Sequence, residues 1–302
     1  MATVVSFINF KGGVGKTTLC IEIAASLASP KFNEKVLIVD LDPQTNATLS
    51  LMTEKEWEDH AASRGTLRNY FEACYEGRDF DLSSIIVKNP VKYRDMLNNL
   101  DIIPSHIELF GMDLKLATKL GHENLKAKLF LKKALEPLQK SYTYIFIDCP
   151  PNLYLATQNG MFASDHYIIV ALAEYLSTLG IAHIHKSVAS IFSDASKLLA
   201  DIGSTGNPLS PPSLAGIIFN RIRSIYSGTY SQEDVIRRVS NDYPNMVFNA
   251  RVPQSDKIAV RAEQKIPIAV SGYAVDRQYE DRMAEAATEF YERLTRPHNG
   301  RV

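Results

Sequence analysis

Residues 10–18 read Phe10-Lys11-Gly12-Gly13-Val14-Gly15-Lys16-Thr17-Thr18, between an apolar run at residues 4–8 and a helix-like segment that starts near Lys16. A strand, a glycine-rich loop and a helix N-terminus in this order direct unpaired backbone N–H groups and the positive end of the helix dipole at one point. The stretch therefore predicts a phosphate-binding loop.

The residue types in this loop indicate how a Mg²⁺-nucleotide is held. We expect Lys16 to reach the β- and γ-phosphates and Thr17 to give its hydroxyl to Mg²⁺. The remaining members of the expected cradle are Gly12, Gly13, Val14, Gly15 and Thr18. Phe10 stands where the general P-loop pattern has glycine, so the loop departs from the common form at its first position.

Length and composition favour one large α/β domain over residues 1–302, with a helical elaboration at about 53–100. The net charge of −1 gives no global attraction to nucleic acid, so DNA binding needs a local patch or one assembled by oligomerisation.

Cys20, Cys74 and Cys149 lie far apart, which argues against a disulfide framework and fits a reducing cytoplasm. No signal peptide precedes the first strand, and no apolar run approaches the roughly 18 residues of a membrane span, so we expect a soluble cytoplasmic protein.

Short apolar runs predict the strands, at residues 3–9, 36–40, 100–104, 144–148, 167–171 and 214–220. Most are continuous rather than alternating, as in strands covered on both faces, and helical segments lie between them. This order predicts a doubly wound, mainly parallel sheet with helices on both faces, whose ligands sit at the carboxyl ends of the strands. In the 53–100 elaboration we expect helices near 54–62 and 66–76, and Trp57 to pack rather than to stack on a ligand.

Three aspartates follow predicted strands. Asp40 and Asp42 lie at the exit of the 36–40 strand, and Asp148 ends the 144–148 strand. If these strands flank the first one, all three carboxylates face the phosphates. Asp148 then fits the carboxylate that Mg²⁺ needs, Asp42 would orient or deprotonate the attacking water, and Asp40 would support the water shell of the metal.

The chain resembles the ParA/MinD class of deviant Walker A ATPases, and within it the ParA-type partition ATPases. The resemblance rests on five stretches, which are residues 11–18, Asp40-Leu41-Asp42-Pro43-Gln44-Thr45-Asn46-Ala47-Thr48, Asp148-Cys149-Pro150-Pro151, Ala173-Glu174-Tyr175-Leu176-Ser177-Thr178-Leu179-Gly180 and Val252-Pro253-Gln254-Ser255. Thr45 departs from many relatives, which have glycine there.

This resemblance implies an ATPase with ATP and Mg²⁺ as cofactors, which forms a nucleotide-sandwich homodimer. Lys11 of each subunit would reach the phosphates of the other subunit, and Asp42 matches the hydrolytic aspartate. Asn220, Val252 and Pro253 fall where such proteins hold adenine.

ParA-type proteins bind DNA without sequence preference through basic residues in the C-terminal half, and work with a ParB-like or other cargo adaptor. Residues 221–265 hold eight basic and five acidic residues, a net charge of +3. The candidates for DNA contact are Arg221, Arg223, Arg251, Lys257, Arg261 and Lys265. The resemblance thus implies a nucleoid-associated protein that segregates plasmid, chromosome or other cargo.

Three alternatives stay open at this point. One is a membrane-associated spatial regulator like MinD, in which the C-terminal segment, with Tyr279, Met283 and Phe290 on one helical face, grips lipid instead of docking on the sheet. We expect docking, and no membrane contact. A metal-cluster ATPase of the same superfamily would need cysteine pairs that the chain lacks. The last alternative is a nucleotide-binding scaffold that does not hydrolyse ATP.

Overall fold

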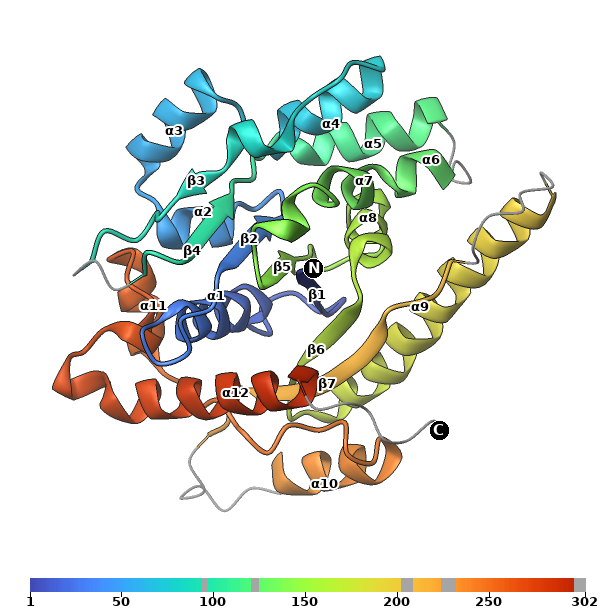
Figure 1. The fold of residues 1–302 in the computed structure, drawn as a ribbon. Helices are drawn as coiled ribbons and strands as arrows, with labels where there is room; N and C mark the ends of the chain where they lie inside the picture. Colours follow the sequence, from blue (N-terminus) through green and yellow to red (C-terminus); the bar gives the residue numbers. More distant parts are fainter. Residues whose placement is uncertain (94–96, 121–124, 202–208, 224–231, 296–302) are drawn as a thin grey trace.

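The computed structural model describes residues 1–93, 97–120, 125–201, 209–223 and 232–295. In these residues seven strands form one sheet in the order β3-β4-β2-β5-β1-β6-β7, in which only β3 is antiparallel to its neighbour (Figure 1). The strands are β1 Thr3–Ile8, β2 Val36–Asp40, β3 Val87–Lys88, β4 Leu100–Ile103, β5 Tyr144–Asp148, β6 His166–Leu172 and β7 Ser213–Asn220.

Helices cover both faces of this sheet, and α9 projects beyond it (Figure 1). The α-helices are α1 Lys16–Ala28, α2 Asn46–Leu51, α3 Glu54–Ser63, α4 Leu67–Glu76, α5 Leu109–Leu120, α6 Leu125–Lys128, α7 Phe130–Leu135, α8 Leu155–Ala163, α9 Tyr175–Asp201, α10 Gln232–Asp242, α11 Asp256–Glu263 and α12 Arg277–Thr295. Short 3-10 turns are η1 Leu82–Ile85, η2 Leu138–Lys140, η4 Ile268–Val270 and η5 Ala274–Asp276.

Continuous apolar strands arise because both faces of the sheet are buried. Along β2, Ile38 packs in the cluster that contains α1 and α12, whereas Leu37 and Val39 pack in the cluster that contains α4 and α8. In β5, Phe146 and Ile147 divide between the same two clusters. The predicted doubly wound fold is therefore confirmed.

The condition set for the three aspartates, that their strands flank β1, holds for β5 and not for β2. Strand β2 does not flank β1, because β5 lies between them and pairs with both. Asp40 is consequently the register partner of Asp148 across β2 and β5, and both acids still reach the same edge of the sheet as the phosphate loop. The short strand β3 was not predicted, because two residues carry no periodicity.

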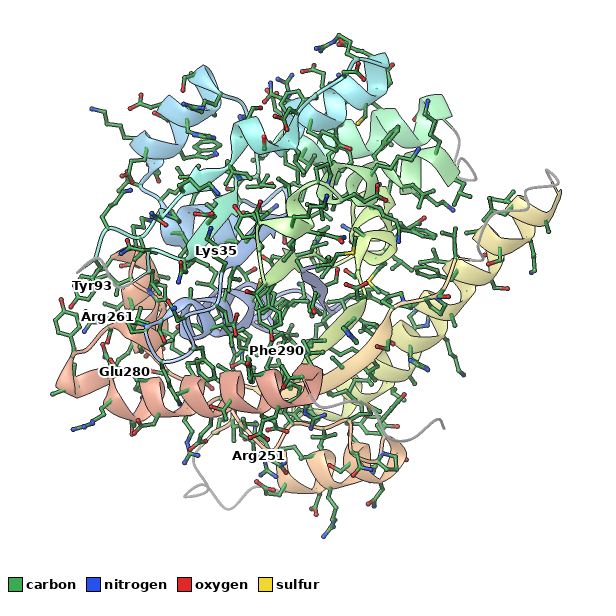
Figure 2. The ribbon with its side chains drawn as sticks, viewed as in Figure 1. Lys35, Tyr93, Arg251, Arg261, Glu280 and Phe290 are labelled. Carbon is green, nitrogen blue, oxygen red and sulfur yellow. The ribbon has the colours of Figure 1, made fainter. Side chains whose placement is uncertain are left out.

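The C-terminal helix docks on the sheet, as predicted. On α12, Met283, Ala286 and Ala287 are buried, and the Phe290 ring lies 5.6 Å from that of Tyr144 between the helix and the sheet (Figure 2). The helices predicted near 54–62 and 66–76 are α3 and α4.

Glycines and prolines predict a loop at residues 201–213, and it is described only in part, since residues 202–208 lie outside the described residues. That the whole chain forms one domain stays a prediction.

Candidate nucleotide site

The phosphate loop turns sharply into α1 at Gly15, whose φ of 89° lies in the left-handed region that favours glycine. Its close neighbour is Asn220 at the end of β7, which donates its side-chain N–H to the Val14 carbonyl at 2.9 Å. A Cβ on Gly15 would lie 2.0 Å from Asn220 Nδ2. Asn220 therefore holds the loop in place, and glycine is required beside it.

A cavity of about 610 Å³ opens over this loop, between α1, the end of β2, and α11. Of the predicted cofactor residues, eight line it: Gly12, Gly13, Gly15, Lys16, Thr17, Thr18, Asn220 and Pro253. Val14 and Val252 do not, because both are fully buried behind it. Lys16 is only 6% exposed. A buried ammonium beside the N-terminus of α1 makes this cavity an anion site.

Asp40 and Asp148 are buried to the same extent but differ in their hydrogen bonds. Asp40 is fully buried, and its Oδ2 accepts hydrogen bonds from the Thr48 backbone N–H at 2.8 Å and from the Thr48 hydroxyl at 2.6 Å. Asp148 is also fully buried, and among the described residues no donor, the nearby Thr17 hydroxyl included, meets its carboxylate oxygens with full hydrogen-bond geometry. Burial raises the pKa of Asp148 to about 7, against the lowering effects of the Thr17 hydroxyl and of Lys16. Burial, with the neighbouring Asp148 charge, also raises the pKa of Asp40.

A buried carboxylate of this kind beside Thr17 and Lys16 is the feature that a Mg²⁺ ion with its waters would satisfy, so these residues fit the metal. Thr17 and Asp148 are the better candidates to hold it. The role of Asp40 at the metal stays a prediction, since its carboxylate already holds the first turn of α2. Among the described residues there is no group of three or more histidine, cysteine or acidic side chains that would bind a metal without help.

Asp42 lines the cavity from the end of β2, and its Oδ1 accepts the backbone N–H of Gln44 at 2.9 Å. The turn continues through Thr45, which has a φ of 55° and donates its backbone N–H to the Asp42 carbonyl. This left-handed backbone favours glycine, and the chain has threonine there.

Lys11 does not line the cavity, unlike Lys16 of the same loop. Its Nζ is 2.7 Å from a Glu174 carboxylate oxygen, and its side chain is 44% exposed. Phe10 packs edge-on against His183 of α9, 5.8 Å between ring centroids, so the start of the loop lies against the first turns of this helix.

Sequence reasoning missed Glu22, a buried acid that also lines the cavity. It accepts the backbone N–H groups of Ile268 at 3.0 Å and Ala269 at 2.8 Å, and so attaches η4 to α1. Burial raises its pKa to about 7, against the lowering effect of these two hydrogen bonds. The available signal was a charge inside an otherwise apolar stretch of the first helix, Cys20 to Ala25.

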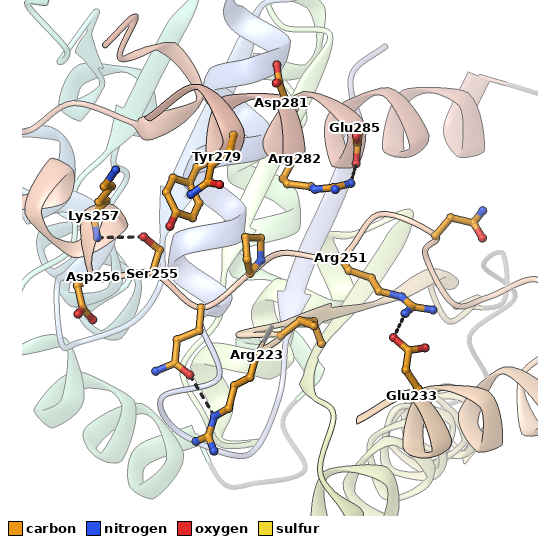
Figure 3. Close-up of a pocket in the computed structure, with 15 residues that line it drawn as sticks. Arg223, Glu233, Arg251, Ser255, Asp256, Lys257, Tyr279, Asp281, Arg282 and Glu285 are labelled. Atoms are coloured by element: carbon orange, nitrogen blue, oxygen red, sulfur yellow. Dashed lines mark hydrogen bonds and ion pairs between the residues drawn. The ribbon is translucent and has the colours of Figure 1, made fainter. Parts of the chain in front are cut away.

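Three of the basic residues predicted to bind DNA line an open groove of about 1550 Å³ next to the nucleotide cavity (Figure 3). Arg251 pairs with Glu233, Arg223 donates to Gln254 at 3.3 Å, and Lys257 donates to the Val275 carbonyl. The groove also contains acids, so its charge is mixed.

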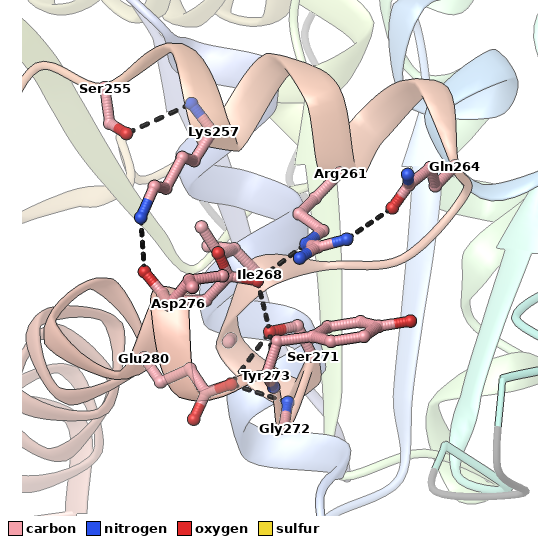
Figure 4. Close-up of polar contacts among 12 residues, drawn as sticks. Ser255, Lys257, Arg261, Gln264, Ile268, Ser271, Gly272, Tyr273, Asp276 and Glu280 are labelled. Carbon is pink, nitrogen blue, oxygen red and sulfur yellow. Dashed lines mark hydrogen bonds and ion pairs between the residues drawn. The ribbon is translucent and has the colours of Figure 1, made fainter.

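The other three candidates lie elsewhere. Arg221 lines the nucleotide cavity, and the Lys265 ammonium donates to the Leu49 carbonyl. The side chain of Arg261 is 12% exposed, with Nε 2.6 Å from Asp276 and the guanidinium 3.9 Å from the centroid of the Tyr273 ring (Figure 4). Its contact with DNA stays a prediction that this buried pair does not favour.

Among the described residues, no helix combines the length and the apolar character that crossing a membrane requires.

Comparison with known proteins matches residues 2–200 to the family AAA_31, an AAA domain. The sporulation initiation inhibitor protein Soj of Bacillus subtilis is 35% identical over 188 residues, which span 62% of this chain and 65% of that protein, slightly under two thirds of its length. The chromosome-partitioning ATPase Soj of Treponema pallidum is 28% identical over 98% of this chain and 96% of its own length. The solved structure of Cyanothece McdA in complex with ATP has a TM-score of 0.72 over 99% of both chains, at 20% identity, which shows a common fold.

The family model covers well over half of the chain, and four of the five stretches that carry the resemblance contribute residues to the cavity just described, residues 173–180 being the exception. The chain therefore belongs to the AAA_31 family, among the ParA-type partition ATPases.

Proposed function

We propose that the chain is a Mg²⁺-dependent ATPase that hydrolyses ATP to ADP and phosphate and forms a homodimer with ATP between its subunits. The observation that carries this proposal is the different position of two lysines in one loop. Lys16 is buried in the cavity, whereas Lys11 lies outside it against Glu174. Because an exposed pair of this kind contributes only ~0.2–1 kcal/mol, Lys11 can leave Glu174 for the phosphates of a second subunit.

The surface around Lys11 supports such an assembly. Tyr154, Tyr175 and Leu179 are large side chains left exposed on the segments that follow β5 and β6. Glu174, the partner of Lys11, directly precedes Tyr175. Large exposed side chains on segments that leave the carboxyl ends of these strands, the edge of the sheet where the phosphate loop lies, suit a subunit interface.

The described residues support a hydrolysis mechanism by positioning and charge. The loop N–H groups and Lys16 bind the phosphates, and Thr17 with Asp148 would hold Mg²⁺, which neutralises charge on the phosphate oxygens. Asp42 lines the same cavity and accepts the backbone N–H of Gln44, which supports its proposed role of orienting the attacking water and accepting its proton.

We propose further that the ATP dimer binds DNA without sequence preference, associates with the nucleoid in the cytoplasm, and releases DNA when a ParB-like or other adaptor stimulates hydrolysis. The net charge of +3 over residues 221–265 supports this, since a dimer doubles that excess of basic residues. The cargo would be a plasmid, a chromosome or another assembly, and the name of the Treponema relative, a chromosome-partitioning ATPase, supports a role in segregation.

The experiment compares the wild-type chain with Lys16→Ala, Lys11→Ala and Asp42→Ala. We expect Lys16→Ala to lose ATP binding, Lys11→Ala to bind ATP as a monomer, and Asp42→Ala to form an ATP dimer that binds non-specific DNA and does not release phosphate. Gel filtration, phosphate release and DNA binding across salt measure these three properties, and Lys35→Ala, whose exposed side chain lies at the opposite ends of the strands, serves as the control.

Persistence of the dimer in Lys11→Ala would contradict the cross-subunit role. Failure of the Asp42→Ala dimer to bind DNA, together with ATP-dependent sedimentation on anionic liposomes, would favour the MinD-like alternative instead. Phosphate release that survives in Lys16→Ala would show that the activity belongs to another site.

A further inference from the structure

Ser105 is a fully buried residue whose three polar groups bind three different segments. Its hydroxyl donates to the Asp42 carbonyl at 2.8 Å, and its backbone N–H donates to the Thr48 hydroxyl oxygen at 3.0 Å. Its carbonyl accepts the indole N–H of Trp57 at 3.0 Å. A single residue after β4 thus joins the end of β2, helix α2 and helix α3.

The hydrogen bonds continue from Ser105 to the carboxylates of the nucleotide site. Thr48, which accepts from Ser105, donates its hydroxyl to Asp40 at 2.6 Å, and Asp40 accepts the backbone N–H of Asp42 at 3.2 Å. Both backbone polar groups of Asp42 therefore belong to this network, the N–H through Asp40 and the carbonyl through Ser105. A fixed backbone on both sides determines the direction of the Asp42 side chain.

Trp57 makes the hydrogen bond by which α3 reaches Ser105, and α3 has no fully buried residue of its own. The indole packs against the core cluster under α2 and lies 5.3 Å from the His106 ring. The 53–100 elaboration is thus attached to the residue that holds the Asp42 backbone.

We infer that Ser105 is a positioning residue for hydrolysis, which fixes the Asp42 backbone and is itself held in place by Trp57. This inference rests on the proposed function, in which Asp42 directs the attacking water. Small displacements of a positioned group reduce the rate of reaction strongly, since about 1 Å can cost about 100-fold. The expected effect therefore appears in kcat, because Ser105 does not line the nucleotide cavity.

The test compares Ser105→Ala with Ser26→Ala, which removes a buried hydroxyl that also donates to a backbone carbonyl, within α1. We expect Ser105→Ala to lower kcat for ATP hydrolysis about 10-fold with KM unchanged within about 2-fold, and Ser26→Ala to leave both unchanged. Ser105→Thr keeps the hydroxyl and should recover most of the rate.

The inference is overturned if Ser105→Ala folds and has the kcat of the wild type, or if only its KM rises. The proposed function still stands in that case, provided that Asp42→Ala is inactive. Wild-type hydrolysis by Asp42→Ala overturns both. If Ser105→Ala does not fold, Trp57→Phe replaces it, since phenylalanine keeps an aromatic ring and loses the N–H donor to Ser105. A fall in kcat of about 2- to 3-fold with unchanged KM supports the inference, and an unchanged kcat overturns it.

Discussion

Gly12 and Gly15 lie three positions apart in the phosphate loop, but only one of them is fixed by its backbone. Gly15 has a φ of 89° and faces Asn220, whereas a Cβ on Gly12 would meet nothing within 4 Å. The motif alone does not distinguish them, because it records residue types and not the neighbour that β7 brings to the loop.

We expect Gly15→Ala to destabilise the nucleotide-free protein by about 2–4 kcal/mol, since the methyl group displaces Asn220 and the left-handed backbone costs about 1–2 kcal/mol more. Gly12→Ala, the matched control, should change the free energy of unfolding by less than about 1 kcal/mol. Urea unfolding without nucleotide measures both values. Equal midpoints for the two variants would contradict the role assigned to Asn220.

Glu22 gives the stability of the chain a pH dependence of known sign. Its pKa is about 7 in the folded protein, above its ordinary value of 4.5, because it is buried. Between these two values the folded protein keeps a proton that the unfolded chain releases, so the stability contribution of Glu22 falls as pH rises, and above pH 7 the full cost is about 3 kcal/mol.

Glu22→Gln removes this titration. The free energy of unfolding of the variant, relative to that of the wild type, should therefore increase by up to about 3 kcal/mol between pH 5 and pH 8. Asp40 and Asp148 titrate in both the wild type and the variant, so their contributions to the free energy of unfolding cancel in this difference. Urea titrations at four pH values measure it, with Glu76→Gln on the surface as the control. Parallel pH profiles for wild type and Glu22→Gln would contradict the assignment.

At the level of helices and strands, the sequence predicted the segments that are buried on both faces. It did not predict which strands pair with each other. The β1, β2 and β5 strands follow from apolar runs, and α1 follows from Leu19, Ile23 and Leu27 and ends before Pro30. The neighbour of β1 did not follow, because residue patterns contain no information on strand order. Ser105 was missed for the same reason, since its partners are 48 to 63 residues away.

The packing of helix α12 on the sheet can be tested by substitution. Phe290 is fully buried, with its ring 5.1 Å from that of Phe146, whereas Leu294 one turn later is only partly buried. Phe290→Ala should lower the free energy of unfolding by about 3–5 kcal/mol, and Leu294→Ala by about 1–2 kcal/mol, because the first leaves a closed cavity and the second an open one. Denaturant unfolding tests the order. A larger loss for Leu294→Ala would show that α12 is held mainly by its C-terminal end.

At the level of the whole molecule, the charge count over residues 221–265 predicted a basic surface, but it did not predict which charges are available. Arg251 pairs with Glu233 on α10 and Arg261 pairs with Asp276 in η5, and neither pairing follows from sequence spacing. The first pair is exposed on both sides, and the second is almost fully buried. The energetic consequence differs, since an exposed pair contributes at most about 1 kcal/mol whereas separating a buried pair costs several kcal/mol.

We therefore expect Arg251, and not Arg261, to contact the DNA phosphates. In an ATP dimer, Arg251→Ala removes two phosphate contacts, so the slope of log K against log salt concentration should become shallower by about 1.8, and the affinity at low salt should fall. Lys35→Ala should leave the slope unchanged, because its side chain lies at the far ends of the strands (Figure 2). DNA-binding titrations of the Asp42→Ala dimer at several salt concentrations measure the slopes. If Lys35→Ala reduced the slope as much as Arg251→Ala does, attraction to DNA would come from the total charge of the dimer and not from the groove.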